Sequence, residues 1–145
     1  MFKKIILGLV VIVVCAVAIL FFVTGNAAKL AEYKFGPDKV ASVNAVIGEQ
    51  RKVSGVTSSI SNGVQQKQYT YESESVVKDL TTYTLHLRNN GWIVTKSYDL
   101  AAGNGEAQLG IESADKGKIL IMSIVFEPNK YAIKITKADG QLTRN

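Results

Sequence analysis

The segment SESVVKDLTTYTLHLRNNGW, residues 73–92, carries the clearest pattern of secondary structure in the chain. Its apolar residues recur at the spacing i, i+4, i+7 and i+11, which places them on one face of an α-helix. They are Val76, Leu80, Tyr83 and Leu87. Ser75 stands where an N-cap is expected, and Asn90-Gly91 suits the end of a helix. The stretch therefore predicts a helix over residues 76–89 with one face against a core.

Strand-like segments lie on both sides of this helix. Residues 52–60 and 64–71 flank Asn62-Gly63, and Asn-Gly is the strongest short hairpin signal because both residues tolerate positive φ. After the helix, four segments read as strands because they alternate or are nearly all apolar. They are residues 92–98, 106–112, 118–126 and 131–137. Since 118–126 is almost entirely apolar, we expect a central strand covered on both faces.

The segment before the hairpin is ambiguous. Residues 39–47 place Val40, Val43 and Ile47 on one helical stripe, followed by Gly48 as a C-cap. The same segment is rich in β-branched residues, so a strand is the alternative. The order hairpin, helix, four-stranded meander predicts an α+β domain with an antiparallel sheet and one principal helix packed on it.

The chain begins with an apolar stretch over residues 5–23, preceded by Lys3 and Lys4. Nineteen helical residues extend about 28 Å, close to the hydrocarbon thickness of a bilayer. The sequence therefore predicts that the α+β fold starts with a transmembrane helix that contacts the lipid bilayer through residues 5–23. Its membrane-spanning residues include Ile5, Leu9, Ile12, Val14, Ile19 and Phe22.

This segment also allows other interpretations. Gly25-Asn26-Ala27 permits signal cleavage after Ala27, although the apolar stretch is longer than is usual for a cleaved signal. A lipoprotein would use Cys15, but Val14 before it does not fit a lipobox. We predict a transmembrane signal-anchor at 1–26, a juxtamembrane linker at 27–37 and an extracytoplasmic α+β domain at 38–145. Lysines next to the apolar stretch favour a cytoplasmic N-terminus in a cell membrane.

The charge distribution argues against nucleic acid as a partner. The net charge is +5, and four of the 17 Lys and Arg but one of the 12 Asp and Glu lie before Pro37, which leaves 13 basic and 11 acidic residues after it. The pI near 9.3 therefore reflects mainly the N-terminal segment. The single histidine and single cysteine argue against a metal site of the zinc type. We expect no metal and no cofactor.

Candidate catalytic groups are few. Gly103-x-Gly105 is followed by an alternating strand rather than a helix, so it predicts a hairpin turn and not a phosphate loop. Asp99 and Glu106 flank one loop and are the best carboxylate pair for acid–base chemistry. His86 lies on the helix away from its apolar face, and histidine is the side-chain type that suits a pH sensor.

The aromatic residues of the strands allow two interpretations. Tyr69 and Tyr71 share one strand face, as do Trp92 and Tyr98. Exposed aromatic faces would stack on sugars, but such residues more often build the core of a small sheet. We predict that these four are core residues.

Five lysines gather in the last third of the sequence: Lys116, Lys118, Lys130, Lys134 and Lys137. One interpretation is a surface that binds anionic lipid headgroups or wall polymers. The other is that these lysines protect sheet edges from aggregation.

The leading functional hypothesis is a membrane-anchored binding or scaffolding domain of the cell envelope with a protein partner. The alternatives are a secreted inhibitor or adhesin released after Ala27, and a hydrolase that depends on Asp99 and Glu106.

Overall fold

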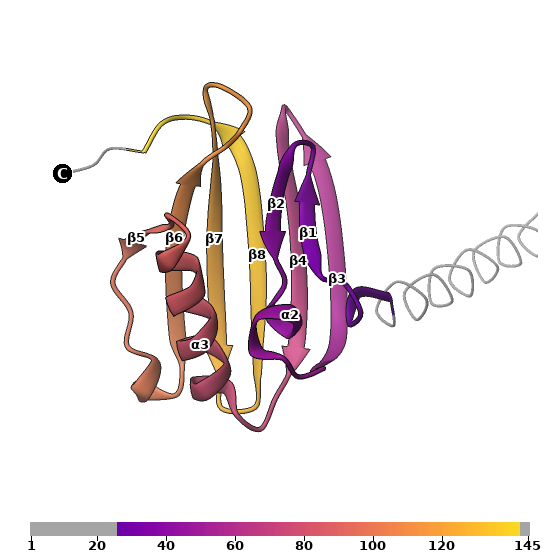
Figure 1. Cartoon of the computed structure of the whole chain (residues 1–145), viewed down its shortest axis with the longest axis vertical. Coiled ribbons are helices and arrows are strands. Elements are labelled where there is room, and N and C mark those ends of the chain that lie inside the picture. Colours follow the sequence, from indigo (N-terminus) through magenta and orange to yellow (C-terminus); the bar gives the residue numbers. More distant parts are fainter. Residues whose placement is uncertain (1–25, 143–145) are drawn as a thin grey trace, which may run out of the picture.

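A computed structural model describes residues 26–142 of the chain (Figure 1). Eleven elements follow one another in these residues. They are β1 (Glu32–Phe35), β2 (Asp38–Ala41), α2 (Val43–Ile47), β3 (Lys52–Ser61), β4 (Val64–Glu72), α3 (Val76–Asn89), β5 (Ile93–Lys96), η1 (Leu100–Ala102), β6 (Gly105–Glu112), β7 (Lys118–Glu127) and β8 (Lys130–Asp139).

Six of the strands form one antiparallel sheet in the order β3-β4-β8-β7-β6-β5. The last strand of the chain, β8, lies between β4 and β7, so it joins the early hairpin to the late meander. β1 and β2 form a separate two-stranded sheet. Figure 1 shows α3 beside the β1–β2 sheet and α2, all on the same face of the large sheet. The core lies between these covering elements and that face.

The helix predicted at 76–89 is confirmed as α3, and all four stripe residues are buried. Its N-terminus differs from the prediction. Ser75 makes no side-chain capping bond, and the backbone N–H of Ser75 donates to Ser73 Oγ at 2.9 Å. Ser73 Oγ in turn donates to the buried carboxylate of Asp79. The first turn of α3 is therefore stabilised by Ser73 and not by the predicted N-cap, Ser75.

The predicted hairpin and meander strands are also confirmed in position. Asn62 has φ 51° and Gly63 has φ 76°, so the turn has positive φ at both central residues, as a two-residue type I′ turn requires. The four later segments form β5 to β8. For the ambiguous segment 39–47, both interpretations are partly right, because β2 is followed directly by α2. α2 is capped by Ser42 and ends at Gly48, whose φ is 72°.

The predicted fold class, which begins with a single-pass transmembrane helix, is contradicted by the helices of the part of the chain that the structure describes. No helix within residues 26–142 is both long and apolar enough to cross a bilayer. The longest, α3, has 14 residues, which extend about 21 Å against the roughly 30 Å of a hydrocarbon core. The predicted spanning residues Ile5, Leu9, Ile12, Val14, Ile19 and Phe22 lie outside the described residues.

The fold class also omits the β1–β2 sheet. Tyr33 and Phe35 of β1 are completely buried. The Tyr33 ring stacks on Tyr69 of β4 with 4.5 Å between centroids. Residues 32–35 are thus part of the domain core, because alternate side chains of this short strand face the large sheet.

Candidate functional site

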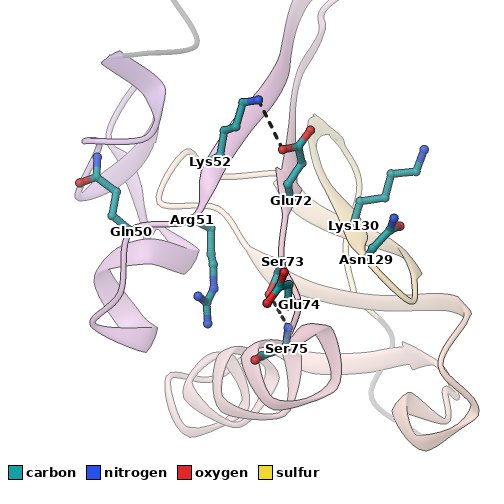
Figure 2. A pocket seen from close by; sticks show the side chains of 9 residues that line it. All are labelled: Gln50, Arg51, Lys52, Glu72, Ser73, Glu74, Ser75, Asn129 and Lys130. Atoms are coloured by element: carbon teal, nitrogen blue, oxygen red, sulfur yellow. Dashed lines mark hydrogen bonds and ion pairs between the residues drawn. The ribbon is translucent and has the colours of Figure 1, made fainter.

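An open groove of about 530 Å³ lies at one end of the large sheet (Figure 2). It is bounded by the start of β3, the end of β4, the turn between β7 and β8, and the N-terminus of α3. Its lining residues are Gln50, Arg51, Lys52, Glu72, Ser73, Glu74, Ser75, Asn129 and Lys130. The charged residues are of both signs, and Lys52 pairs with Glu72 at 3.5 Å. The lining therefore has no single charge preference.

A buried ion pair lies next to this groove. Asp79, only 2% exposed, accepts from Arg51 Nε at 2.8 Å and from the second guanidinium nitrogen at 2.9 Å. Its Oδ2 also accepts from Ser73 Oγ at 2.7 Å and from the Tyr131 hydroxyl at 3.1 Å. These donors come from separate segments of the chain and converge on one carboxylate. This arrangement fixes α3 to the end of the sheet.

The protonation of these groups follows from their neighbours. Burial alone would raise the pKa of Asp79, but the hydrogen bonds from Arg51 and Ser73 outweigh it and hold that pKa below its ordinary value. Burial and the nearby Asp79 charge raise the pKa of Tyr131. Asp79 is therefore a carboxylate and Tyr131 a neutral donor near pH 7. The groups are suited to structural support, because the carboxylate is already occupied by donors.

A second buried ion cluster connects the small sheet to the large one. Lys137 of β8 is 6% exposed, and its ammonium binds Asp38 at 2.8 Å, Asp115, and the carbonyl oxygen of Phe35 at 3.1 Å. Asp38 also accepts from Ser113 Oγ at 2.6 Å and from the backbone N–H of Ala114 at 2.7 Å. Burial would raise the pKa of Asp38, but the bonds from Lys137 and Ser113 lower it. This cluster holds the β1–β2 turn against β8.

The structure does not bring the five candidate lysines together. Lys116 lies in the β6–β7 turn and Lys118 at the start of β7, whereas Lys130 lies at the opposite end of the sheet, about 30 Å along the strands. Lys118 pairs with Asp139 at 3.6 Å, and Lys130 pairs with Glu127 at 3.5 Å. Lys137 is buried, which leaves Lys134 as the member on the middle of a sheet face.

The candidate carboxylates have separate partners. Asp99 Oδ1 accepts from the backbone N–H of Ala101 at 3.0 Å and caps η1. Glu106 pairs with Lys96 at 3.1 Å, and this bond lowers the pKa of Glu106. A general acid requires a raised pKa, so the environment of Glu106 shifts it the other way.

His86 is partly exposed on α3, and its backbone oxygen accepts from Asn90 Nδ2 at 2.7 Å. Within residues 26–142, no group of three or more His, Cys, Asp or Glu side chains is placed to hold a metal ion.

The core assignment of the strand aromatics is confirmed for Tyr69, Tyr71 and Trp92, which are buried, and Tyr98 is partly buried against the same core. The structure adds Tyr33, whose hydroxyl contacts that of Tyr71 and accepts from the backbone N–H of Val43 at 3.3 Å. Burial raises the pKa of Tyr71 to about 12, although the Tyr33 contact opposes this shift. The tyrosine hydroxyls are therefore uncharged links between the two sheets.

The other face of the large sheet carries no covering element over its centre among the described residues. Two rows of cross-strand neighbours run over it from β4 to β6, and we call them the uncovered face: Thr70, Ala132, Val125 and Glu106, then Gln68, Lys134, Ser123 and Gln108. Val125 is 50% exposed, so β7 is not covered on both faces as its sequence predicts. The surface mixes apolar, polar and charged groups.

The C-terminal segment contacts one border of this face. An added Cβ on Gly110 would lie 2.9 Å from Leu142 Cδ2 and 3.0 Å from Ile121 Cδ1. Leu142 is therefore seated over Gly110, where β6 lacks a side chain. The two rows of the uncovered face remain beside this contact.

Sequence reasoning missed Arg51 and Asp79 as a pair, although a signal exists. Asp79 lies three residues after Val76 and four before Tyr83, so it is on the buried stripe of α3. A charge on such a stripe requires a buried partner. Comparisons with protein families, with curated proteins and with solved structures find no match for this chain.

Proposed function

We propose that the domain of residues 26–142 is a protein-binding or scaffolding module that binds through the uncovered face. The observation that supports this is the asymmetry of the large sheet: α3, α2 and the small sheet cover one face, while the rows around Val125 and Lys134 face outward. Antiparallel sheets tolerate such a solvent face, so it is free to serve recognition.

The shape and chemistry of this face favour a protein partner over a small molecule. Small molecules bind mainly in concave, largely apolar sites, whereas the uncovered face is formed by side chains of neighbouring antiparallel strands and is largely polar. Protein interfaces mix apolar and polar groups in much the same proportion as other surfaces. Val125 and Ala132 lie next to Lys134 and Gln68 in such a mixture. The two ion clusters lie elsewhere and support the scaffold.

The predicted envelope location outside the cytoplasm stays a prediction, as does lipid contact through residues 5–23, because both depend on residues outside those described. The carboxylate-dependent hydrolase and the secreted inhibitor or adhesin remain alternative hypotheses for the function of the chain.

Substitutions on the uncovered face test the proposal. Lys134→Glu inverts the central charge, and Val125→Lys places a charge on the most exposed apolar position of the face. In extracts of cells that make the full chain, native electrophoresis should show loss of complexes heavier than a dimer for both variants. Val77→Lys on α3, at a position 41% exposed, is the matched control and should keep them. Unchanged complexes in both face variants would contradict the proposal.

A further inference from the structure

The two edges of the large sheet differ in how they are protected. At one edge, β5 has four residues, a register shift between Val94 and Lys96, and a charged lysine paired to Glu106. Short length, irregular register and lysine are common means of preventing edge-to-edge pairing. β5 therefore has three such features.

The opposite edge strand, β3, is long, and it has a lysine, Lys52, and an irregular register only at its beginning. It has ten residues, and its segment VSGVTSSIS, residues 53–61, contains no charge and no proline. Its one register shift lies near the beginning, between Val53 and Gly55. Every residue from Thr57 to Ser61 is exposed, and Ile60 is 77% exposed. Figure 1 shows β3 as the outermost strand on its side of the sheet.

The backbone of this strand is oriented to accept another strand. Ser61 and Val64 close a two-residue hairpin and therefore form a hydrogen-bonded pair. In an antiparallel ladder the direction of the backbone groups alternates along the strand. The N–H and C=O groups of Val56, Ser58 and Ile60 accordingly point away from β4, toward the open edge.

We infer that β3 pairs antiparallel with β3 of a second copy of this chain, about a twofold axis at Ser58. Ser58 of one copy then lies opposite Ser58 of the other. Ile60 of each copy lies opposite Val56 of the other, and these are the residues whose backbone groups face the edge. The two sheets become one continuous sheet.

A second copy fits this edge because the strand is complementary to itself. In a twofold pairing every contact between two different residues occurs twice. Any contact between like charges would therefore also occur twice. The absence of charge over residues 53–61 avoids that repulsion. The pairing also covers Ile60, the most exposed large apolar side chain of the described chain, with another β-branched residue.

This inference rests on the edge strand and not on the uncovered face, so it stands or fails independently of the proposed function. If both hold, two uncovered faces lie side by side on one joined sheet. A scaffold built in this way presents its binding surface twice.

Cysteine cross-linking tests the register directly. The chain has one cysteine, which Cys15→Ala removes. In that background, Ser58→Cys places two thiols opposite each other, with Cα atoms about 5.5 Å apart, inside the range of disulfides. Ser54→Cys is the matched control, since Ser54 is also exposed on β3. Its copies would lie about 27 Å apart, eight residues along the strand.

Cells producing each full-length variant are treated with a mild oxidant, then analysed by non-reducing electrophoresis and mass spectrometry. The inference predicts a disulfide dimer for Ser58→Cys and none for Ser54→Cys. Adding Ile60→Lys to Ser58→Cys should abolish the dimer while circular dichroism shows an unchanged fold. A dimer that persists in this variant would overturn the proposal. So would equal cross-linking at 54 and 58, no cross-link at 58, or a cross-link from 58 only to a different protein.

Discussion

Replacing Asp79 by asparagine should destabilise the domain strongly, because it removes the charge that Arg51, Ser73 and Tyr131 surround. Removing one partner of a buried ion pair costs about 3–5 kcal/mol. Arg51 retains some solvent contact, with a side chain 21% exposed, and has Glu49 as a second partner at 2.6 Å. We therefore expect Asp79→Asn to lower the free energy of unfolding by about 2–3 kcal/mol at pH 7.

The measurement is urea unfolding of the full chain followed by fluorescence of Trp92, the single tryptophan, which is buried. A non-denaturing detergent keeps the apolar residues 5–23 in solution. Glu49→Gln is the control, because Glu49 is 53% exposed and surface ion pairs contribute little. It should change the free energy by at most about 0.5 kcal/mol.

Acid provides a second readout with a defined sign. The pKa of Asp79 is lower in the fold than in the unfolded chain, where it is about 3.9. The ion pair therefore stabilises the fold above the unfolded pKa, and this contribution is lost as the pH falls through the lower folded pKa. The difference between wild type and Asp79→Asn should shrink on acidification. A loss below about 1 kcal/mol at pH 7, or a difference that stays constant in acid, would contradict this role of the ion pair.

Three further predictions concern other parts of the fold. Lys137→Met should lower the free energy of unfolding in urea by about 2–4 kcal/mol, because the buried carboxylate of Asp38 loses its ammonium partner. Lys134→Met on the same strand should lower it by at most about 0.5 kcal/mol. Equal losses for the two variants would contradict this prediction. Asn62→Ala should cost about 1 kcal/mol, since alanine is strained at the positive φ of the turn, and no loss would argue against a type I′ turn. Gly110→Val should displace Leu142, because the added side chain would occupy the space where Leu142 packs. Amide exchange and proteolysis of the C-terminal residues should then become faster, and unchanged rates would contradict this contact.

Elements that depend on contacts between residues close together in the sequence could be predicted from the local sequence pattern. The stripe of α3 and the Asn62-Gly63 turn determine structure through contacts within a few residues, and both are confirmed. The strands of the meander were predicted for the same reason. Their alternation is visible in the sequence whatever they pair with.

Long-range contacts explain what the sequence did not predict. Tyr33 and Phe35 sit in a stretch too short to show a period, and only stacking on Tyr69 and the bond from Lys137 reveal β1 as a core strand. The insertion of β8 beside β4 depends on residues more than sixty positions apart along much of the ladder. The predicted fold class relied on the apolar composition of the N-terminal segment and did not include the β1–β2 sheet.

The candidate site was predictable only in part. Lys134 belongs to the predicted lysine group and lies on the uncovered face, but Lys137 of the same group is buried by the alternation that buries Tyr131, Ile133 and Ile135. A lysine in phase with three core residues was a readable signal of burial. The rows that form the uncovered face were not predictable, because they are defined by registers between strands distant in sequence.

Binding of a protein through the uncovered face is best tested by site-specific photo-crosslinking from that face. A photoreactive amino acid is placed at Val125 in the full chain, and at Val77 on α3 as the control. We expect a discrete adduct with one protein from position 125, lost when Lys134→Glu is added, and no such adduct from position 77. Absence of an adduct at 125, or the same adducts from both positions, would contradict binding through this face.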